Sequence, residues 1–124
     1  MNFQTTVHYN TIIHVIHTDG ATVVLSSLPN LRIIGWSSSR PSIFQIAATQ
    51  FCSICKPCKL VEAFFMIINF HGYEGSKDHC QAIDEALTSD NFPSLRSVQL
   101  FQEIPFDYFP TLQSRNLLSV RHRL

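Results

Sequence analysis

The sequence predicts an α/β fold built as a short solenoid of about three strand–helix units, over a single repeat-like domain of residues 1–124. Three observations predict it. Strand-like apolar segments centre near residues 34, 67 and 98, and a segment compatible with a helix lies between each pair. A Φ-Pro-x-Leu signature also recurs along the chain. Even spacing of strand and helix is typical of a solenoid, in which each unit buries its apolar face against its neighbours.

The Φ-Pro-x-Leu signature occurs at 28–31, 92–95 and 109–112. In the first two copies an arginine, Arg32 or Arg96, follows the leucine, and β-branched residues come soon after it. Proline disfavours helical backbone in the residue before it, so each copy predicts an extended entry into a strand. The spacing of about 32 residues exceeds the usual 20 to 29 of leucine-rich repeats, so irregular units are expected.

The amino-terminal part is rich in β-branched residues from Thr5 to His17, which predicts one strand or two. His14 and His17 would share a face only on a helix, so ordinary half-exposed histidines are expected rather than a metal pair. Residues 18–20 predict a turn, and residues 21–27 fit either a short helix or a strand.

The first repeat-like unit follows at residues 28–36, with three candidate core residues: Ile33, Ile34 and Trp36. Residues 37–41 predict a loop. Residues 43–51 carry apolar side chains at helical spacing. Because the composition of residues 37–60 differs from that of the flanking segments, one hypothesis is that this stretch is an insertion into the ancestral fold. The apolar run at 64–70 predicts the second strand, and residues 71–76 predict a turn.

The next helix is expected to begin at Asp78, which can cap its first turn, with Gln81 completing a capping-box pattern. Asp84 and Glu85 are expected on the polar face. Residues 88–91 compete with the helix backbone and should end the helix. The apolar face carries the residues that recur at helical spacing: Cys80, Ile83 and Leu87.

The carboxy-terminal third begins with a predicted half-buried strand, in which Val98 and Leu100 alternate with polar residues. The aromatic segment 104–110 has two interpretations. It could be an exposed recognition patch or the packed end of the solenoid, and packing is the favoured one. Residues 112–120 form a terminal apolar segment that is compatible with a helix. The positive charge of Arg121 would interact favourably with the carboxy-terminal end of the dipole of that helix.

The stretch from His79 to Val120 resembles the carboxy-terminal part of fungal F-box proteins with degenerate leucine-rich repeats. The resemblance rests on the helix around Ile83, on Phe92-Pro93-Ser94-Leu95-Arg96-Ser97-Val98 and on the segment from Phe109 to Val120. Residues 28–32 are similar to an earlier repeat of the same kind. No F-box-type opening occurs near Met1. The resemblance implies a protein-binding substrate receptor of a ubiquitin ligase.

The sharpest chemical pattern is a run of three cysteines at C-x2-C spacing, Cys52, Cys55 and Cys58. Thiolates at this spacing can converge on one metal ion, and Cys80 or His79 could supply a fourth ligand. However, no second C-x2-C pair is present, and Cys80 already fits an apolar helix face. No metal site, catalytic residue or cofactor is therefore predicted, and these four cysteines remain weak metal-site candidates.

Composition excludes several functional classes. Hydrophobic residues make up 45% of the chain, which is not a disordered composition. The formal net charge is zero, and no basic stripe suggests a nucleic-acid partner. No apolar run reaches the 18 residues that a membrane span needs, and no signal peptide is evident. An intracellular protein with free thiols, cytoplasmic or nuclear, is expected.

Three functional hypotheses follow. The first is a non-catalytic interaction scaffold that presents one face to a protein partner, and no enzyme motif in the sequence competes with it. The second is a small metal-binding protein built on the cysteines. The third is a fragment of a longer protein without an independent function.

Overall fold

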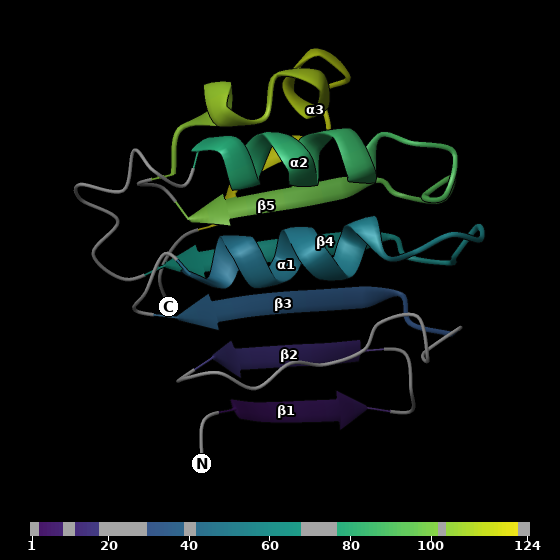
Figure 1. Cartoon of the computed structure of the whole chain (residues 1–124), viewed down its shortest axis with the longest axis vertical. Coiled ribbons are helices and arrows are strands. Elements are labelled where there is room, and N and C mark those ends of the chain that lie inside the picture. Colours follow the sequence, from purple (N-terminus) through teal and green to yellow (C-terminus); the bar gives the residue numbers. More distant parts are fainter. Residues whose placement is uncertain are drawn as a thin grey trace.

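The strands lie side by side in one sheet, in the same order as in the chain (Figure 1). The computed structural model describes residues 3–8, 12–17, 30–38, 42–67, 77–101 and 104–121. Within these residues the sheet contains β1 (Phe3–His8), β2 (Ile12–His17), β3 (Ile33–Ser38), β4 (Glu62–Ile67), β5 (Ser97–Phe101) and β6 (Leu118–Arg121). Strand β1 runs antiparallel to β2, and every later neighbour is parallel. The predicted α/β class is confirmed.

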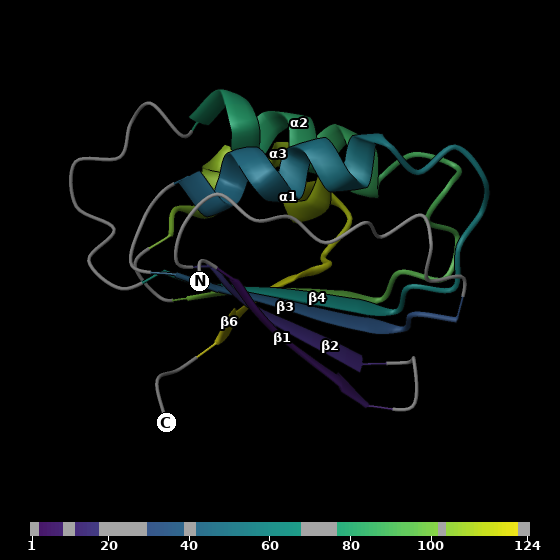
Figure 2. The ribbon, with the colours of Figure 1, turned by 60° about the horizontal axis from the view of Figure 1, so that its bottom comes forward.

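The helices cover one face of this sheet, and the opposite face has no helix among the described residues (Figure 2). They are α1 (Ser42–Cys52), α2 (Lys77–Leu87) and α3 (Pro110–Ser114), with a short 3-10 turn, η3 (Phe106–Tyr108), before α3. A helix-bearing connection joins β3 to β4, β4 to β5 and β5 to β6. Because parallel neighbours cannot be joined by a tight turn, each connection must cross back over the sheet.

The core lies between the helices and the sheet, and alternate residues of the central strands point into it. These inward residues are fully or almost fully buried: Ile34, Trp36, Ala63, Phe65, Val98 and Leu100. The Trp36 ring packs edge-to-face on Phe51 of α1, at 6.0 Å between ring centroids. Ile33, one of the predicted core residues, instead lies on the opposite face and is only half-buried. Its place follows from the period of two, since Ile34 occupies the inward position.

The observed strands agree with the sequence in position. Strands β3 and β5 coincide with the segments expected near residues 34 and 98, and the segment from Thr5 to His17 forms two strands rather than one. Strand β4 begins at Glu62, two residues before the apolar run, because the backbone of that residue already pairs with β3. The expectations for residues 18–27, 39–41 and 71–76 fall outside the described residues.

The strand register aligns the segments that proline and arginine only partly mark. Ile33, Glu62 and Ser97 are aligned across β3, β4 and β5. One position earlier, Arg32, Val61 and Arg96 are therefore equivalent, so the Pro-x-Leu-Arg pattern is kept in the outer units and replaced in the middle one. Backbone bonds hold this alignment. The Val61 amide donates to the Arg32 carbonyl at 2.7 Å, and the Arg96 amide donates to the Val61 carbonyl at 2.8 Å.

Helix α2 ends at Leu87 as expected, and its apolar face is buried as expected. It begins at Lys77, so Asp78 lies in the first turn, where a negative charge is favourable. The prediction that Asp84 lies on the outward polar face of this helix is wrong, because its side chain is only 2% exposed. The α3 segment packs beyond α2 and covers this position. The Asp84 carboxylate accepts hydrogen bonds from the backbone amides of Thr111, at 3.0 Å, and Leu112, at 2.7 Å.

The carboxy-terminal segment differs from the expected helix. Helix α3 stops after one turn, and Leu118 to Arg121 form a strand beside β5. Asn116 adopts a left-handed conformation with φ of 59°, which turns the chain, and the Val98 amide donates to the Leu117 carbonyl at 2.8 Å. Pairing with an open strand edge thus outweighs the local helical pattern.

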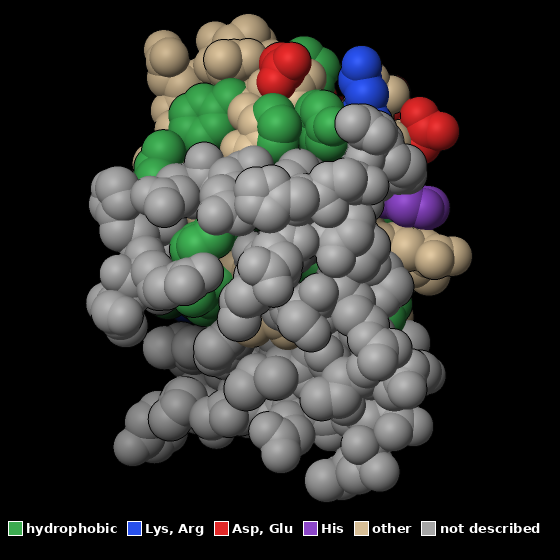
Figure 3. Space-filling model, turned by 90° about the vertical axis from the view of Figure 1, so that its left-hand side faces the viewer, with side chains coloured by type: hydrophobic (Ala, Val, Ile, Leu, Met, Phe, Trp, Pro, Cys, Tyr) green, Lys and Arg blue, Asp and Glu red, His purple; other side chains and the backbone are tan. Residues whose placement is uncertain are grey.

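The aromatic segment before α3 is packed rather than displayed. Ile104 and Phe109 are buried, and Phe106 and Tyr108 lie partly buried against the core. Figure 3, which faces the edge at which β3 and β5 finish, shows that some apolar side chains remain at the surface at the top of the molecule, where Figure 1 places α2 and α3. The aromatic side chains of residues 104–110 are therefore packed against the core, and the place of this segment at the end of a solenoid stays a prediction.

Helix α1 is integral to the folded unit. Ile43, Phe44 and Ala47 are fully buried, and the Phe44 ring lies 5.8 Å from that of Phe65 on β4. The hypothesis that residues 37–60 were inserted concerns ancestry and stays a prediction. In the folded chain, the described part of this stretch supplies one layer of the core.

Candidate functional site

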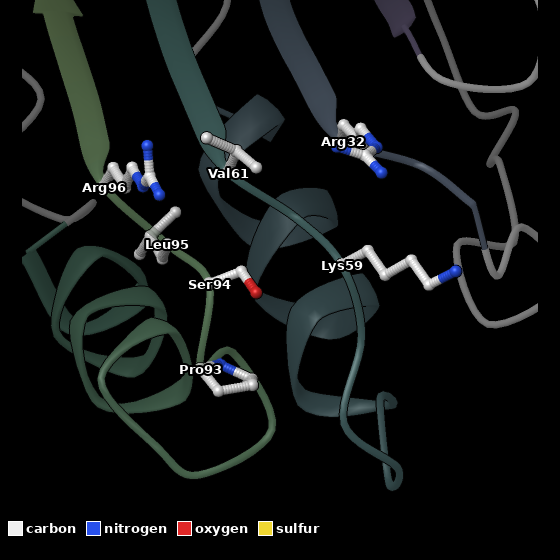
Figure 4. A pocket seen from close by; sticks show the side chains of 7 residues that line it. All are labelled: Arg32, Lys59, Val61, Pro93, Ser94, Leu95 and Arg96. Atoms are coloured by element: carbon white, nitrogen blue, oxygen red, sulfur yellow. The ribbon is translucent and has the colours of Figure 1, made fainter.

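A pocket of about 530 Å³ lies at the edge of the sheet where β3, β4 and β5 begin (Figure 4). It is formed by the last residues of the loops that enter these strands. Its lining residues are Arg32, Lys59, Val61, Pro93, Ser94, Leu95 and Arg96. The pocket thus joins side chains from three strand entries, and the outermost of these residues, Arg32 and Arg96, lie 64 positions apart in the sequence.

The repeat pattern itself positions the two arginines. Leu31 is 5% exposed and anchors the entry to β3 in the core, and Leu95 is half-buried at the equivalent place before β5. The residue that follows each leucine meets solvent, so Arg32 and Arg96 are both exposed. Pro93 restricts the backbone of the entry to β5, because its ring fixes φ. The buried leucine and the rigid proline therefore fix the position of the backbone from which the arginine side chain extends.

Three cations gather at this pocket: Arg32, Lys59 and Arg96. All three are exposed, and among the described residues none of them forms an ion pair with a carboxylate. Arg32 and Arg96 are separated by the β4 chain at Val61, so their Cα atoms lie two strand spacings apart, roughly 10 Å. In a chain of zero formal net charge, this is a local concentration of positive charge.

Figure 4 shows how the side chains are directed. Arg96, Val61 and Arg32 lie next to one another on the three entering strands. The Ser94 hydroxyl points into the space between the chains that enter β4 and β5, whereas the Lys59 side chain extends away from Ser94. The two guanidinium groups and the Ser94 hydroxyl are therefore the central polar groups, and Lys59 lies at the rim.

The helix-free face of the sheet is the second candidate surface. Ile33 and Met66 are half-buried there, and Ser119 is exposed. The ring of Phe64 lies over Gly35 of the paired strand, where a Cβ atom would collide with it, so glycine at this position leaves room for the ring on the face of the sheet. The described residues of this face combine apolar and polar side chains, with Glu62 among them, which is compatible with contact to another protein.

On the helix-free face, the Glu62 carboxylate forms a hydrogen bond with a neighbouring strand. It accepts a bond from Gln99 Nε2 at 3.5 Å. This is at the long limit for a hydrogen bond, so it contributes little to stability. Glu62 and Gln99 lie on the adjacent strands β4 and β5.

The candidate cysteines are not brought together as a metal site. Cys52 and Cys55 are exposed at and after the end of α1, Cys58 is half-buried, and Cys80 is fully buried on α2. Burial raises the pKa of the Cys80 thiol, which keeps it protonated. In the described part of the chain, no group of three or more His, Cys, Asp or Glu side chains could hold a metal ion.

The pocket residues were not identified as a site from the sequence. Arg32, Ser94 and Arg96 belong to the Pro-x-Leu-Arg signature, whereas Lys59 lies outside it. The signal that could have found them is the strand alignment, which places Lys59 and Ser94 at the same position of neighbouring units. That alignment could not be read from the middle unit, because Leu60-Val61 lacks the proline and arginine.

No family model, curated protein or solved structure matches this chain. Among the described residues, none of the helices has the length and apolar character to cross a membrane.

Proposed function

We propose that this chain is a non-catalytic protein-interaction module, a short and irregular leucine-rich-repeat-like solenoid that binds a protein partner on the helix-free face of its sheet. One observation carries the proposal. The strands follow chain order, while the helices cover a single face, so every unit places equivalent side chains on the other face. A stack of units therefore offers an extended surface, as repeat proteins do.

The chemistry of the surface supports binding rather than catalysis. The described residues of the helix-free face include Ile33, Met66, Gln99 and Ser119, with Glu62 as a carboxylate. Among these described residues, no hydrogen bond pairs the Ser119 hydroxyl with a base. Apolar and uncharged polar groups of this kind gain from burial against a second protein without a large desolvation cost.

The resemblance to F-box proteins with degenerate leucine-rich repeats suggests which kind of partner. If the family's role holds, the partner would be a protein marked for ubiquitination, in the cytoplasm or nucleus, and the module would act as the substrate-receptor part of a ubiquitin ligase. The helix-free face would then be the substrate-binding surface.

The test compares two variants of equal charge change. Ser97→Arg with Ser119→Arg places two cations on the helix-free face, because the register puts both positions on the face that Gln99 occupies. Gln81→Arg with Gln113→Arg places two cations on exposed positions of α2 and α3. Each protein is used for affinity capture from cells, with quantitative mass spectrometry of what is retained.

The proposal expects at least one protein that the wild type and the α2–α3 variant retain and the sheet-face variant loses. Its Kd for the purified wild-type chain should then weaken roughly tenfold or more in the sheet-face variant, since an uncompensated charge in an interface costs at least about 1.4 kcal/mol. If the sheet-face variant captures the same proteins as the wild type, this face is not the binding surface and the proposal fails.

A further inference from the structure

We propose that the pocket at the start of β3, β4 and β5 binds an acidic segment of a protein partner, with Arg32 and Arg96 as the two carboxylate-binding groups. The kind of partner rests on the proposed function. The site itself does not, because it lies at the edge of the sheet and not on its helix-free face. An acidic segment could engage the pocket while the rest of the partner lies on that face.

Charge is the first argument. The chain has nine basic and nine acidic residues apart from its histidines, so there is no general excess of cations from which a basic pocket would arise by chance. Arg32, Lys59 and Arg96 nevertheless line one hollow, and no described carboxylate pairs with them. Pairs of like charge at such separation repel each other, and a bound anion would remove that repulsion.

The shape of the polar groups is the second argument. A guanidinium group presents a planar fork of donors that matches the two oxygens of a carboxylate. The Ser94 hydroxyl, directed between the entering chains, can donate a further bond. Val61, Pro93 and Leu95 supply apolar contact for the aliphatic part of a peptide. Arginine forks with apolar contact between them suit a peptide better than a free inorganic ion.

Spacing selects an extended acidic segment rather than a single carboxylate. Arg32 and Arg96 stand roughly 10 Å apart, on either side of Val61. In a polyproline II segment, residues three apart lie on the same side of the chain and are separated by a similar distance of about 9 Å. An acidic run with carboxylates at this spacing would meet both arginines at once. Lys59 at the rim would meet a third acidic residue.

A nucleic acid fits the pocket less well. Single-stranded nucleic acids are usually bound by a cationic groove together with aromatic side chains on which the bases stack. The seven lining residues include no aromatic side chain. Three cations also neutralise few phosphates, whereas a backbone-binding surface uses a longer series of them. The observations therefore favour an acidic peptide.

The experiment measures binding of a fluorescein-labelled hexaglutamate peptide to the full chain by fluorescence anisotropy in low-salt buffer. Hexaglutamine with the same label is the neutral control. The pocket variant is Arg32→Gln with Arg96→Gln. The matched control variant, Lys77→Gln with Arg115→Gln, removes two exposed cations elsewhere. All four positions are exposed, so both variants are expected to fold, which circular dichroism checks.

The proposal expects saturable hexaglutamate binding that weakens with added salt. The pocket variant should weaken it by about five- to thirtyfold, the loss of two exposed ion pairs, and the control variant by less than about twofold. Equal loss in both variants, no difference between hexaglutamate and hexaglutamine, or tighter binding of oligouridylate than of hexaglutamate would overturn the proposal. The sheet-face and pocket variants change separate residues, so either proposal can fail alone.

Discussion

Asp84 is the position at which this fold is expected to be most sensitive to a single polar substitution. Its carboxylate lies on α2 at 2% exposure and accepts the amides of Thr111 and Leu112 at the start of α3. These are two of the orphan amides that every helix leaves at its first turn. Phe109, the residue before α3, provides no side-chain cap, so α2 supplies the cap from a neighbouring unit.

Asp84→Ala removes both acceptors and leaves two amides unpaired beneath the packed segment. Hydrogen bonds to charged groups contribute about 1.5–3 kcal/mol each, so the free energy of unfolding should fall by about 3–5 kcal/mol. That is a large share of the about 5–15 kcal/mol available to a domain. Asp84→Asn keeps one acceptor oxygen and presents a donor to the other amide, so we expect a loss of about 2 kcal/mol.

Urea unfolding at neutral pH measures the effect, with the fluorescence of the single, buried Trp36 and far-UV circular dichroism as probes. Glu85→Ala is the matched control, because Glu85 is the exposed neighbour on the same helix and should change stability by about 0.5 kcal/mol or less. A loss in Asp84→Ala within about 1 kcal/mol of that in Glu85→Ala would refute the assignment of Asp84 as the cap of α3.

The other predictions concern the sheet and the thiols. Gly35→Ala should destabilise the fold by about 1–3 kcal/mol in a thermal or urea melt, because its Cβ collides with the Phe64 ring. Phe64→Leu combined with it should recover part of the loss, and no recovery would contradict the steric cause. A thiol reagent should label Cys52 and Cys55 in the native protein but Cys80 only after unfolding; rapid native labelling of Cys80 would disprove its burial. Burial raises the pKa of the Cys80 thiol, so the folded state favours the protonated form. In the unfolded chain the pKa of this thiol is about 8.5. The stabilisation from keeping the thiol protonated in the folded state is therefore complete below this pH and declines as pH rises above it. Cys80→Ala should flatten that decline in urea melts above this pH. Finally, a chelator should leave the melting temperature unchanged, since no ligand cluster was found in the described residues, and a lowered melting temperature would revive the metal hypothesis.

Local pattern predicted the elements whose packing agrees with their sequence. The alternation around Val98 and the helical spacing of Cys80, Ile83 and Leu87 gave β5 and α2 nearly to the residue. The packing of residues 104–110 also followed from their aromatic and proline content. In these segments the buried face is the apolar face that side-chain periodicity predicts. Long-range contacts therefore agree with the local secondary-structure preference.

Other features depended on contacts with distant segments of the chain, which the local sequence does not predict. Asp84 reads as a surface residue of α2, and only the position of α3 makes it a buried cap. Residues 118–121 are compatible with a helix until β5 offers an unpaired edge.

The sequence by itself determined where β3, β5 and α2 form, because side-chain periodicity and proline act over a few residues. The tertiary structure alone decided which charged groups meet. Arg32 and Arg96 lie sixty-four positions apart, and Lys59 lies between them in a unit that lacks the repeat signature. They share a pocket because β3, β4 and β5 pair in parallel and in register, which brings the starts of successive strands to one edge of the sheet.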